Sequence, residues 1–326
     1  IKKSAMFRFI FSFLLISNFS HSQKKMKIPR YLKKGDTVAI VCTARKFFPE
    51  DAIPAKELLE SWGLKTKLGN TIGLDSCQLG GTDAERAADF QNMMDDDNVK
   101  AIWCARGGYG TVRIIDMLDF TKFKKHPKWV IGFSDITLLH NHCTQALKIA
   151  SLHAPMAGAF NNGQSNNEWV LSLKHALQGK KANYKAATHT YNKFGKATGK
   201  LVGGNLTLVA HAVGTVSGLQ TKNAILFLED IGEYKYNIDR MMLQLKRSGM
   251  LKNLAGLVVG GFTQTKDSDP AFGATVYEII EAAVAEYNYP VCYDFPVSHD
   301  KENYAIKHGM EYALEVTAKK VSLKEV

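Results

Sequence analysis

The sequence lacks the short motifs by which metal-binding and nucleotide-binding proteins are most often recognised. Its 326 residues contain no C-x-x-C, no H-E-x-x-H, no P-loop lysine motif, and no G-x-G-x-x-G after the first expected strand. The five cysteines are odd in number and widely spaced, which argues against a disulfide framework. These absences disfavour a zinc protein and a dinucleotide- or NTP-binding enzyme, and we expect neither a metal nor a cofactor.

Long apolar runs are also scarce, and the one notable run lies at the start of the chain. Lys2, Lys3 and Arg8 lead into "FIFSFLLISNF", and "SHS" before Gln23 has the small-x-small form of a signal-peptidase site. The run is too short to span a bilayer comfortably, and no later stretch approaches 18 apolar residues. We therefore expect a signal peptide at 1–22, export to the periplasm, and no transmembrane segment in the mature chain.

Acidic residues are few, and the formal net charge is +11. Removing residues 1–22 takes away three positive charges and no acids, which leaves +8. Six lysines and no acids lie between Lys180 and Lys200, with aromatic residues between them. No nucleic-acid-binding module surrounds this basic run, so a solvated linker is the favoured interpretation and no nucleic-acid partner is expected. A basic exported protein would suit an anionic cell envelope.

Apolar runs alternate with segments of helical spacing, which predicts βαβ units and a parallel sheet covered by helices on both faces. The length suggests about two domains. We expect an α/β fold with an N-terminal parallel-sheet domain of the Rossmann or flavodoxin type at 23–160, a linker at 161–198 that holds one helix, and a smaller mixed α/β domain at 199–326. Strands are expected at 36–42, 101–105, 129–131, 224–230, 256–262 and, as the last, 312–316.

Open α/β sheets bind ligands beyond the carboxyl ends of their strands, and three such ends carry unusual residues. Ser134 stands at a strand-to-helix corner in "WVIGFSDIT", which suits either a nucleophile or an ordinary helix N-cap. "RGGYG", from Arg106 to Gly110, suits an oxyanion hole or a tight turn. At the third of these ends, Glu229 and Asp230 close the strand expected at 224–230, where a carboxylate can orient a histidine or cap a turn.

Two histidines are candidates for a catalytic base. His299 in "FPVSHD" follows a turn that contains a proline and does not lie in an apolar face. His153 in "SLHAP" also ends a strand and is its main rival. A serine, a glutamate and a histidine at separate strand ends together favour nucleophilic catalysis over a structural role for each residue alone.

The motifs "GTDAERAADFQNMMDDDNVKAIWCARGGYG", "GFSDIT", "GGNLTL", "LFLEDIGEYKYNIDRMM" and "FPVSH" occur in the order found in the LD-carboxypeptidase family, which the chain resembles over nearly its whole mature length. These serine peptidases trim the terminal D-alanine from murein tetrapeptides, and the family also includes the microcin-immunity peptidases. The resemblance implies a parallel-sheet domain and a smaller mixed domain, with the active site between them.

The resemblance also implies a Ser-His-Glu triad of Ser134, His299 and Glu229, and an oxyanion hole made by the backbone N–H groups of Gly108 and Asp135. The candidate substrate-binding residues are Arg106, Tyr109 and Asn205. Arg106 is one candidate for the group that grips the terminal carboxylate, and a cradle of backbone N–H groups is the other. Two departures from the family pattern, Ser298 before the histidine and Lys307-His308 near the final glycine, concern the substrate pocket more than the triad.

Three alternatives to murein trimming stay open at this stage. The chain could be a microcin-immunity-type peptidase that acts on a peptidyl-nucleotide antibiotic, a binding protein that holds envelope peptides without cutting them, or a nucleotide-binding protein. The last two are disfavoured by the complete set of triad residues and by the missing nucleotide motifs. The expected partner is a small peptide or muropeptide, with diaminopimelate or lysine at its third position. The oligomeric state is open, with a homodimer as one option.

Overall fold

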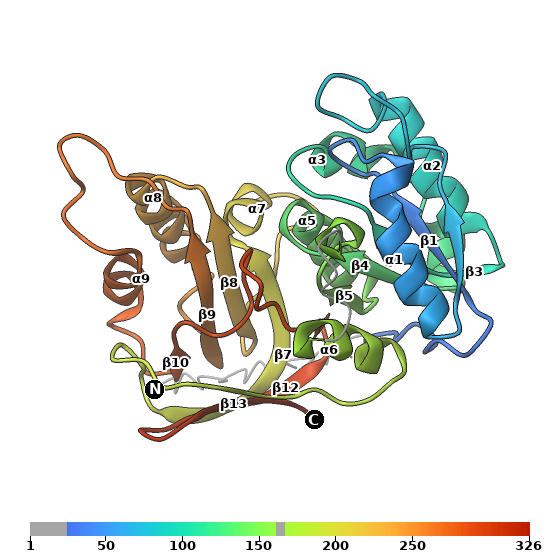
Figure 1. Cartoon of the computed structure of the whole chain (residues 1–326). Helices are drawn as coiled ribbons and strands as arrows, with labels where there is room; N and C mark the ends of the chain where they lie inside the picture. Colours follow the sequence, from blue (N-terminus) through green and yellow to red (C-terminus); the bar gives the residue numbers. More distant parts are fainter. Residues whose placement is uncertain (1–24, 161–166) are drawn as a thin grey trace, which may run out of the picture.

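The computed structural model describes residues 25–160 and 167–326, which form two sheets with helices packed around them (Figure 1). The predicted signal peptide at 1–22 and the first residues of the predicted linker lie outside the described residues. Within the described residues, no helix is both long and apolar enough to cross a bilayer.

The first sheet has six strands in the order β11-β5-β4-β3-β1-β2. Its strands are β1 Thr37–Val41, β2 Lys65–Leu68, β3 Val99–Cys104, β4 Trp129–Gly132, β5 Ser151–His153 and β11 Ile306–His308. The first five strands are parallel, and β11 pairs antiparallel with β5. Helices around it are α1 Pro49–Ser61, α2 Asp83–Asp95, α3 Thr111–Ile114, α4 Thr121–Lys125, α5 Thr137–His142 and α6 Glu168–Leu177. The predicted parallel sheet is confirmed.

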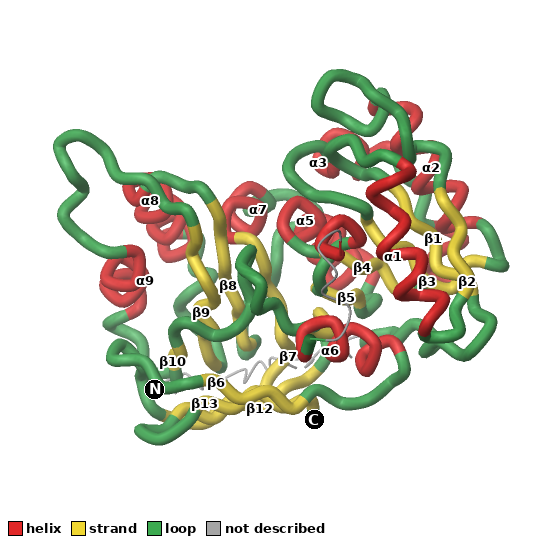
Figure 2. Tube along the Cα trace, in the orientation of Figure 1, coloured by secondary structure: helices red, strands yellow, loops and turns green. Residues whose placement is uncertain are grey.

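Both faces of this sheet are apolar because helices cover both of them (Figure 2). Successive residues of β1 point to opposite sides: Ile40 packs in the core cluster that contains α1 and α6, and Ala39 packs in the cluster that contains α2 and α5. This is why the strand has an almost continuous apolar run. The ends of all five parallel strands then meet at one edge, beside the start of α5.

Local sequence signals place two helix ends correctly. Gly63 follows the last residues of α1 with a φ of +77°, which suits the left-handed position after a helix. At the start of α2, Thr82 Oγ1 accepts the N–H of Glu85 at 3.2 Å, and the Glu85 carboxylate accepts the N–H of Thr82 at 2.7 Å. This is the capping box that the sequence predicts.

The second sheet has seven strands in the order β10-β9-β8-β7-β12-β13-β6. Its strands are β6 Asn183–Ala186, β7 Gly195–Asn205, β8 Ile225–Ile231, β9 Gly256–Thr263, β10 Val291–Cys292, β12 Glu311–Val316 and β13 Val321–Glu325. Strands β7 to β10 are parallel and the others antiparallel. One face is packed by α7 Leu206–His211, α8 Lys235–Arg247 and α9 Val276–Val284 (Figure 1). The expected mixed α/β arrangement is confirmed.

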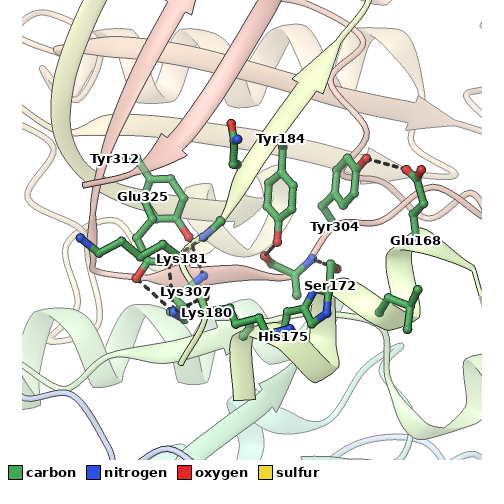
Figure 3. Close-up of a pocket in the computed structure, with 15 residues that line it drawn as sticks. Glu168, Ser172, His175, Lys180, Lys181, Tyr184, Tyr304, Lys307, Tyr312 and Glu325 are labelled. Atoms are coloured by element: carbon green, nitrogen blue, oxygen red, sulfur yellow. Dashed lines mark hydrogen bonds and ion pairs between the residues drawn. The ribbon is translucent and has the colours of Figure 1, made fainter. Parts of the chain in front are cut away.

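The basic segment that we expected to be a linker is partly built into the two sheets, since α6 packs on the first sheet and β6 is an edge strand of the second. Its described part contains α6, the edge strand β6 and the first residues of β7. Figure 3 shows why it is held: the Tyr184 hydroxyl donates to the Ala305 carbonyl at 2.7 Å, and buried Lys307 donates to the Lys180 carbonyl and to the Glu325 carboxylate, each at 3.0 Å. These partners lie more than a hundred residues away or at the chain end, so local composition does not reveal them.

The C-terminal residues also differ from the expectation. The strand near residue 312 is not the last, because β13 follows it and pairs with both β12 and β6. The short strand β11 leaves the second half of the chain and joins the first sheet beside β5. The two sheets are therefore tied together by a strand crossing between them, next to the ends of β4 and β5.

Candidate active site

The serine after β4 stands on a strained corner. Ser134 has a φ of +59°, in the left-handed region that residues other than glycine seldom adopt. It opens a 3₁₀ turn, Ser134–Ile136, whose N-cap is Phe133, so Ser134 is not itself an N-cap serine. The corner is tight because a Cβ on Gly132 would lie 2.8 Å from Ile136 Cγ1. Such a corner presents a hydroxyl beside the free N–H groups of a helix start.

The glycine loop after β3 lies against this serine. A Cβ on Gly107 would lie 3.4 Å from Ser134 Oγ, so the loop backbone is in close approach to the hydroxyl. The next residue, Gly108, has a φ of +103°, a conformation that favours glycine. Its peptide N–H and that of Asp135 belong to the two segments that meet at Ser134. Their proximity is what an oxyanion hole made of backbone donors requires.

Two buried side chains fix the glycine loop in place. The Asp135 carboxylate is 2% exposed and accepts the N–H of Thr111, at the start of α3, at 2.9 Å. Arg86, on α2, is fully buried and donates to the Gly110 carbonyl at 3.0 Å and to the Thr43 carbonyl at 2.6 Å. Asp135 therefore ties the serine corner to the loop, and Arg86 ties the loop to the end of β1.

We expect Asp135→Ala to lower both stability and turnover. It leaves the buried Thr111 N–H without an acceptor, which costs about 1–3 kcal/mol, and it frees the loop that carries Gly108. The expected fall in kcat is about 10-fold, since a displaced donor is weakened rather than removed. Thermal unfolding and steady-state kinetics measure the two effects. Asp119→Ala, which removes an exposed turn contact, is the control, and an unchanged kcat in Asp135→Ala would contradict the role in positioning the loop.

The second half of the chain supplies a buried carboxylate–imidazole pair. His299 Nδ1 lies 2.6 Å from Glu229 Oε2, and the side chains are 11% and 0% exposed. The His299 ring centroid is 4.7 Å from that of Phe133, the residue before Ser134. Burial acts to lower the pKa of His299, but the charge of Glu229 and its hydrogen bond outweigh this, so the pKa lies above its usual value near 6.5. The imidazole of the pair thus contacts the residue that precedes Ser134.

Neighbouring carboxylates have other partners. Asp230 accepts from Asn205 Nδ2 at 2.8 Å and from the Thr207 N–H at 2.9 Å, so it holds the start of α7. Burial and the nearby charge of Glu229 raise the pKa of Asp230 to about 6. Glu233 contacts the Asn237 amide. Of the carboxylates at the end of β8, Glu229 is the one hydrogen-bonded to His299.

The rival histidine lies inside the protein. His153 is fully buried between rings, with its centroid 5.0 Å from Phe227 and 5.9 Å from Phe133. Burial lowers its pKa well below the usual value. Within residues 25–160 and 167–326 no carboxylate is hydrogen-bonded to its ring nitrogens, so no carboxylate orients it.

The three candidate substrate-binding residues are in different settings. Arg106 and Tyr109 are exposed on the glycine loop, Tyr109 by 45%. Asn205 is buried: its Oδ1 accepts the N–H of Leu208 at 3.3 Å, which caps α7, and its Nδ2 donates to Asp230. The Asn205 amide is thus already used within the fold, while the two loop residues lie exposed at the surface.

A cavity of about 200 Å³ opens beside the histidine of the Glu229–His299 pair. Phe133, Trp169 and His299 are among the residues that line it. A larger cavity of about 360 Å³ lies between α6 and the C-terminal strands (Figure 3). It contains none of Ser134, Glu229 and His299, and its Lys307 is paired with Glu325. Of these two cavities, the smaller one adjoins the candidate active site through His299 and Phe133, and neither Ser134 nor Glu229 lines it.

The sequence pattern did not reveal the two side chains that hold the glycine loop, Arg86 and the carboxylate of Asp135. Both are charged residues in the first half of a helical segment, where such residues usually face solvent. One signal was available for Arg86. It lies four residues before Phe90, which packs in the core, so the helical pattern places this charged residue on the buried face. A buried charge needs a partner, and that partner is found only in three dimensions.

Comparisons with known proteins agree on one family. Residues 38–154 match the LD-carboxypeptidase N-terminal domain, and residues 198–314 match the C-terminal domain. A probable murein peptide carboxypeptidase of Bacillus subtilis is 35% identical, over 91% of this chain and 94% of its own length. The murein tetrapeptide carboxypeptidase of Pseudomonas aeruginosa is 28% identical, over 85% and 92%.

Solved structures agree with this result. The crystal structure of muramoyltetrapeptide carboxypeptidase from Oxalobacter formigenes has a TM-score of 0.81 and 28% identity, covering 89% of this chain and 98% of that one. The microcin-immunity protein MccF, solved with glutamyl sulfamoyl guanosine, has a TM-score of 0.78 and 20% identity over 92% and 98%, which shows a shared fold. The chain belongs to the LD-carboxypeptidase family and is a serine-type carboxypeptidase, a hydrolase.

Proposed function

We propose that the protein releases the terminal D-alanine of murein tetrapeptides, with Ser134 as nucleophile, His299 as general base and Glu229 as the acid that orients the histidine. The observation that carries this proposal is the 2.6 Å hydrogen bond between His299 Nδ1 and the fully buried Glu229 carboxylate. A second support is that the His299 ring contacts Phe133, directly beside the strained serine.

The mechanism follows from these positions. Ser134 Oγ attacks the carbonyl carbon before the terminal residue while His299 Nε2 takes the hydroxyl proton. The tetrahedral intermediate then collapses: its C–N bond breaks, and His299 returns the proton to the leaving amine. Water, deprotonated by His299, attacks the acyl ester, which releases the shortened peptide and restores the serine. Proton transfer by one positioned histidine contributes about 10²–10⁴-fold to such reactions.

The backbone N–H groups of Gly108 and Asp135 would hold the oxyanion. Both belong to the segments in contact at Ser134, and each such donor contributes about 3–4 kcal/mol to the transition state. Glu229 keeps the proton of neutral His299 on Nδ1, so that Nε2 is the free base, and it stabilises the imidazolium that forms. Nε2 is buried and has no hydrogen-bond partner among the described residues, so the Ser134 hydroxyl would have to turn toward it for the proton transfer.

The choice of a murein substrate is supported by the relatives. Two relatives that cover most of this chain, at 35% and 28% identity, bear murein peptide names, whereas MccF is only 20% identical. The apolar run and the small-x-small site within residues 1–22 support export to the periplasm, where murein lies. We also propose that 23–160 is the domain that carries the nucleophile and 199–326 the domain that carries Glu229 and His299.

A pair of peptides tests the substrate. The protein should release D-alanine from a tetrapeptide, whose scissile bond follows an L-centre, and leave the D-alanyl-D-alanine bond of the pentapeptide intact. With the terminal carboxylate held, the stereocentre before the scissile carbonyl decides which face meets Gly108 and Asp135. A misplacement of about 1 Å already costs on the order of 10²-fold. Tetrapeptide formed from pentapeptide would contradict the proposal, as would an intact tetrapeptide with cleavage of a peptidyl-nucleotide instead.

A further inference from the structure

A carboxypeptidase must recognise the free carboxylate at the end of its substrate, and the proposed triad does not do this. In a peptide the terminal carboxylate carbon is separated from the scissile carbonyl carbon by only three bonds, a distance of about 4 Å. The group that binds it must therefore lie close to the oxyanion donors. This inference rests on the proposed function, and it requires a cation that lies beside Gly108.

The side chain of Arg45 lies directly on Gly108. Arg45 Nε is 2.5 Å from the point where a Cβ of Gly108 would be, and Arg45 Cδ is 2.6 Å from it. The two segments also meet through their backbones, since the Arg45 N–H donates to the Gly107 carbonyl at 3.4 Å. Gly107 in turn approaches Ser134 Oγ. The guanidinium group and the serine hydroxyl thus each approach one of two adjacent glycines, whose Cα atoms are about 3.8 Å apart.

This contact gives a second reason for glycine at position 108. Besides its φ of +103°, the residue must leave room for the arginine, because any side chain would occupy the space of the Arg45 stem. Because the Arg45 side chain lies over the Gly108 peptide, its N–H donors are next to the Gly108 N–H that would bind the oxyanion. A planar guanidinium can hold a carboxylate through two parallel hydrogen bonds.

Charge balance distinguishes Arg45 from its neighbours. Lys46 pairs with Asp75 at 2.7 Å, and Arg113 pairs with Asp83 at 2.6 Å. Arg45 is exposed, and in the part of the chain that the structure describes it has no acidic partner. A cation beside an active site that is not neutralised by the protein is free to bind an anionic substrate group.

Two other cations are the alternatives. Arg106 is exposed at the start of the glycine loop, but it is Arg45 whose side chain covers Gly108. Lys301 lines the cavity beside His299. A lysine there would present a single-point contact rather than a fork. We propose that Arg45 binds the terminal carboxylate of the substrate and thereby restricts the protein to removing a single C-terminal residue.

The test compares each variant on two peptides, a tetrapeptide with a free carboxylate and the same tetrapeptide with a C-terminal amide. Arg45→Ala should lower kcat/KM for the acid by about 10²-fold, the value of a charge-assisted contact, and leave kcat/KM for the amide nearly unchanged. Arg45→Lys should recover part of the loss. Arg106→Ala and Lys301→Ala are matched controls that should keep the preference for the acid. Circular dichroism and thermal unfolding check that each variant is folded.

Equal losses on acid and amide in Arg45→Ala would overturn the inference, as would loss of the preference in either control variant. A binding measurement separates this from the proposed function. Calorimetry of the acid peptide should show about 10²-fold weaker binding to Ser134→Ala/Arg45→Ala than to Ser134→Ala. If the wild type and Arg45→Ala cleave the tetrapeptide equally well, the inference is overturned and the proposed function stands. If the wild type does not cleave the tetrapeptide, the function fails and the binding comparison decides the role of Arg45, with equal or absent binding counting against it.

Discussion

Replacing Ser134 with alanine should lower kcat for a tetrapeptide by about 10⁴–10⁶-fold, the range seen when a serine peptidase loses its nucleophile. The remaining rate would come from the oxyanion donors and from bound geometry alone. The fold should be unaffected, because alanine keeps the Cβ that approaches Gly107 and meets the same backbone strain at a φ of +59°. The thermal midpoint is expected to match that of the wild type.

Ser248→Ala is a suitable control for this variant. Its hydroxyl donates to the Leu245 carbonyl at the end of α8, so the substitution removes one hydroxyl and one local hydrogen bond outside the site. Turnover should be unchanged. If Ser134→Ala kept more than a few per cent of the wild-type rate, another residue would have to be the nucleophile.

Glu229→Gln should lower kcat by about 10³–10⁴-fold, since a neutral amide can present its NH₂ to Nδ1 and thereby stabilise the wrong tautomer of His299. Asp230→Asn and Glu233→Gln are the matched controls. Neither carboxylate is hydrogen-bonded to His299, and Asp230 holds the start of α7 instead. We expect smaller effects on kcat from both, with a loss of stability for Asp230→Asn. Equal losses for Glu229 and Glu233 would contradict the assignment.

The same pair sets the pH dependence. The proposed base must be neutral, and the pKa of His299 is raised by Glu229 above its usual value near 6.5. Activity should therefore be lost as the pH falls through this raised pKa, on an acid limb above pH 6.5. In Glu229→Gln the residual activity should show its acid limb at lower pH, because the neighbouring negative charge is gone. A pH profile of kcat/KM for both proteins measures this shift.

Much of the fold could be predicted because its signals are local. The apolar run of β4, the capping box of Thr82 and the stop at Gly63 all depend on residues a few positions apart. The placement of β6 and β11 depends on partners far along the chain. A short or basic strand has no periodicity of its own that reveals which sheet it joins, and this is why the second sheet was larger than expected.

The residues of the proposed triad could be selected from the sequence with the help of the family resemblance, which supplies their roles. In the structure Ser134 follows β4, Glu229 lies near the end of β8, and His299 lies in the loop between β10 and β11 rather than at a strand end. Arg45 carries no such signal: in the sequence it is one exposed arginine after an apolar strand, and only the folded chain lays it on Gly108. The same holds for Arg86, whose contact with Gly110 spans 24 residues.

The most direct test of the central claim is the mass of the products formed from a murein tetrapeptide by the wild-type protein and by Ser134→Ala, side by side. We expect a tripeptide and free D-alanine from the wild type, and unchanged tetrapeptide from the variant over the same time. An intact tetrapeptide with the wild type, cleavage at an internal bond, or equal product from both proteins would contradict it.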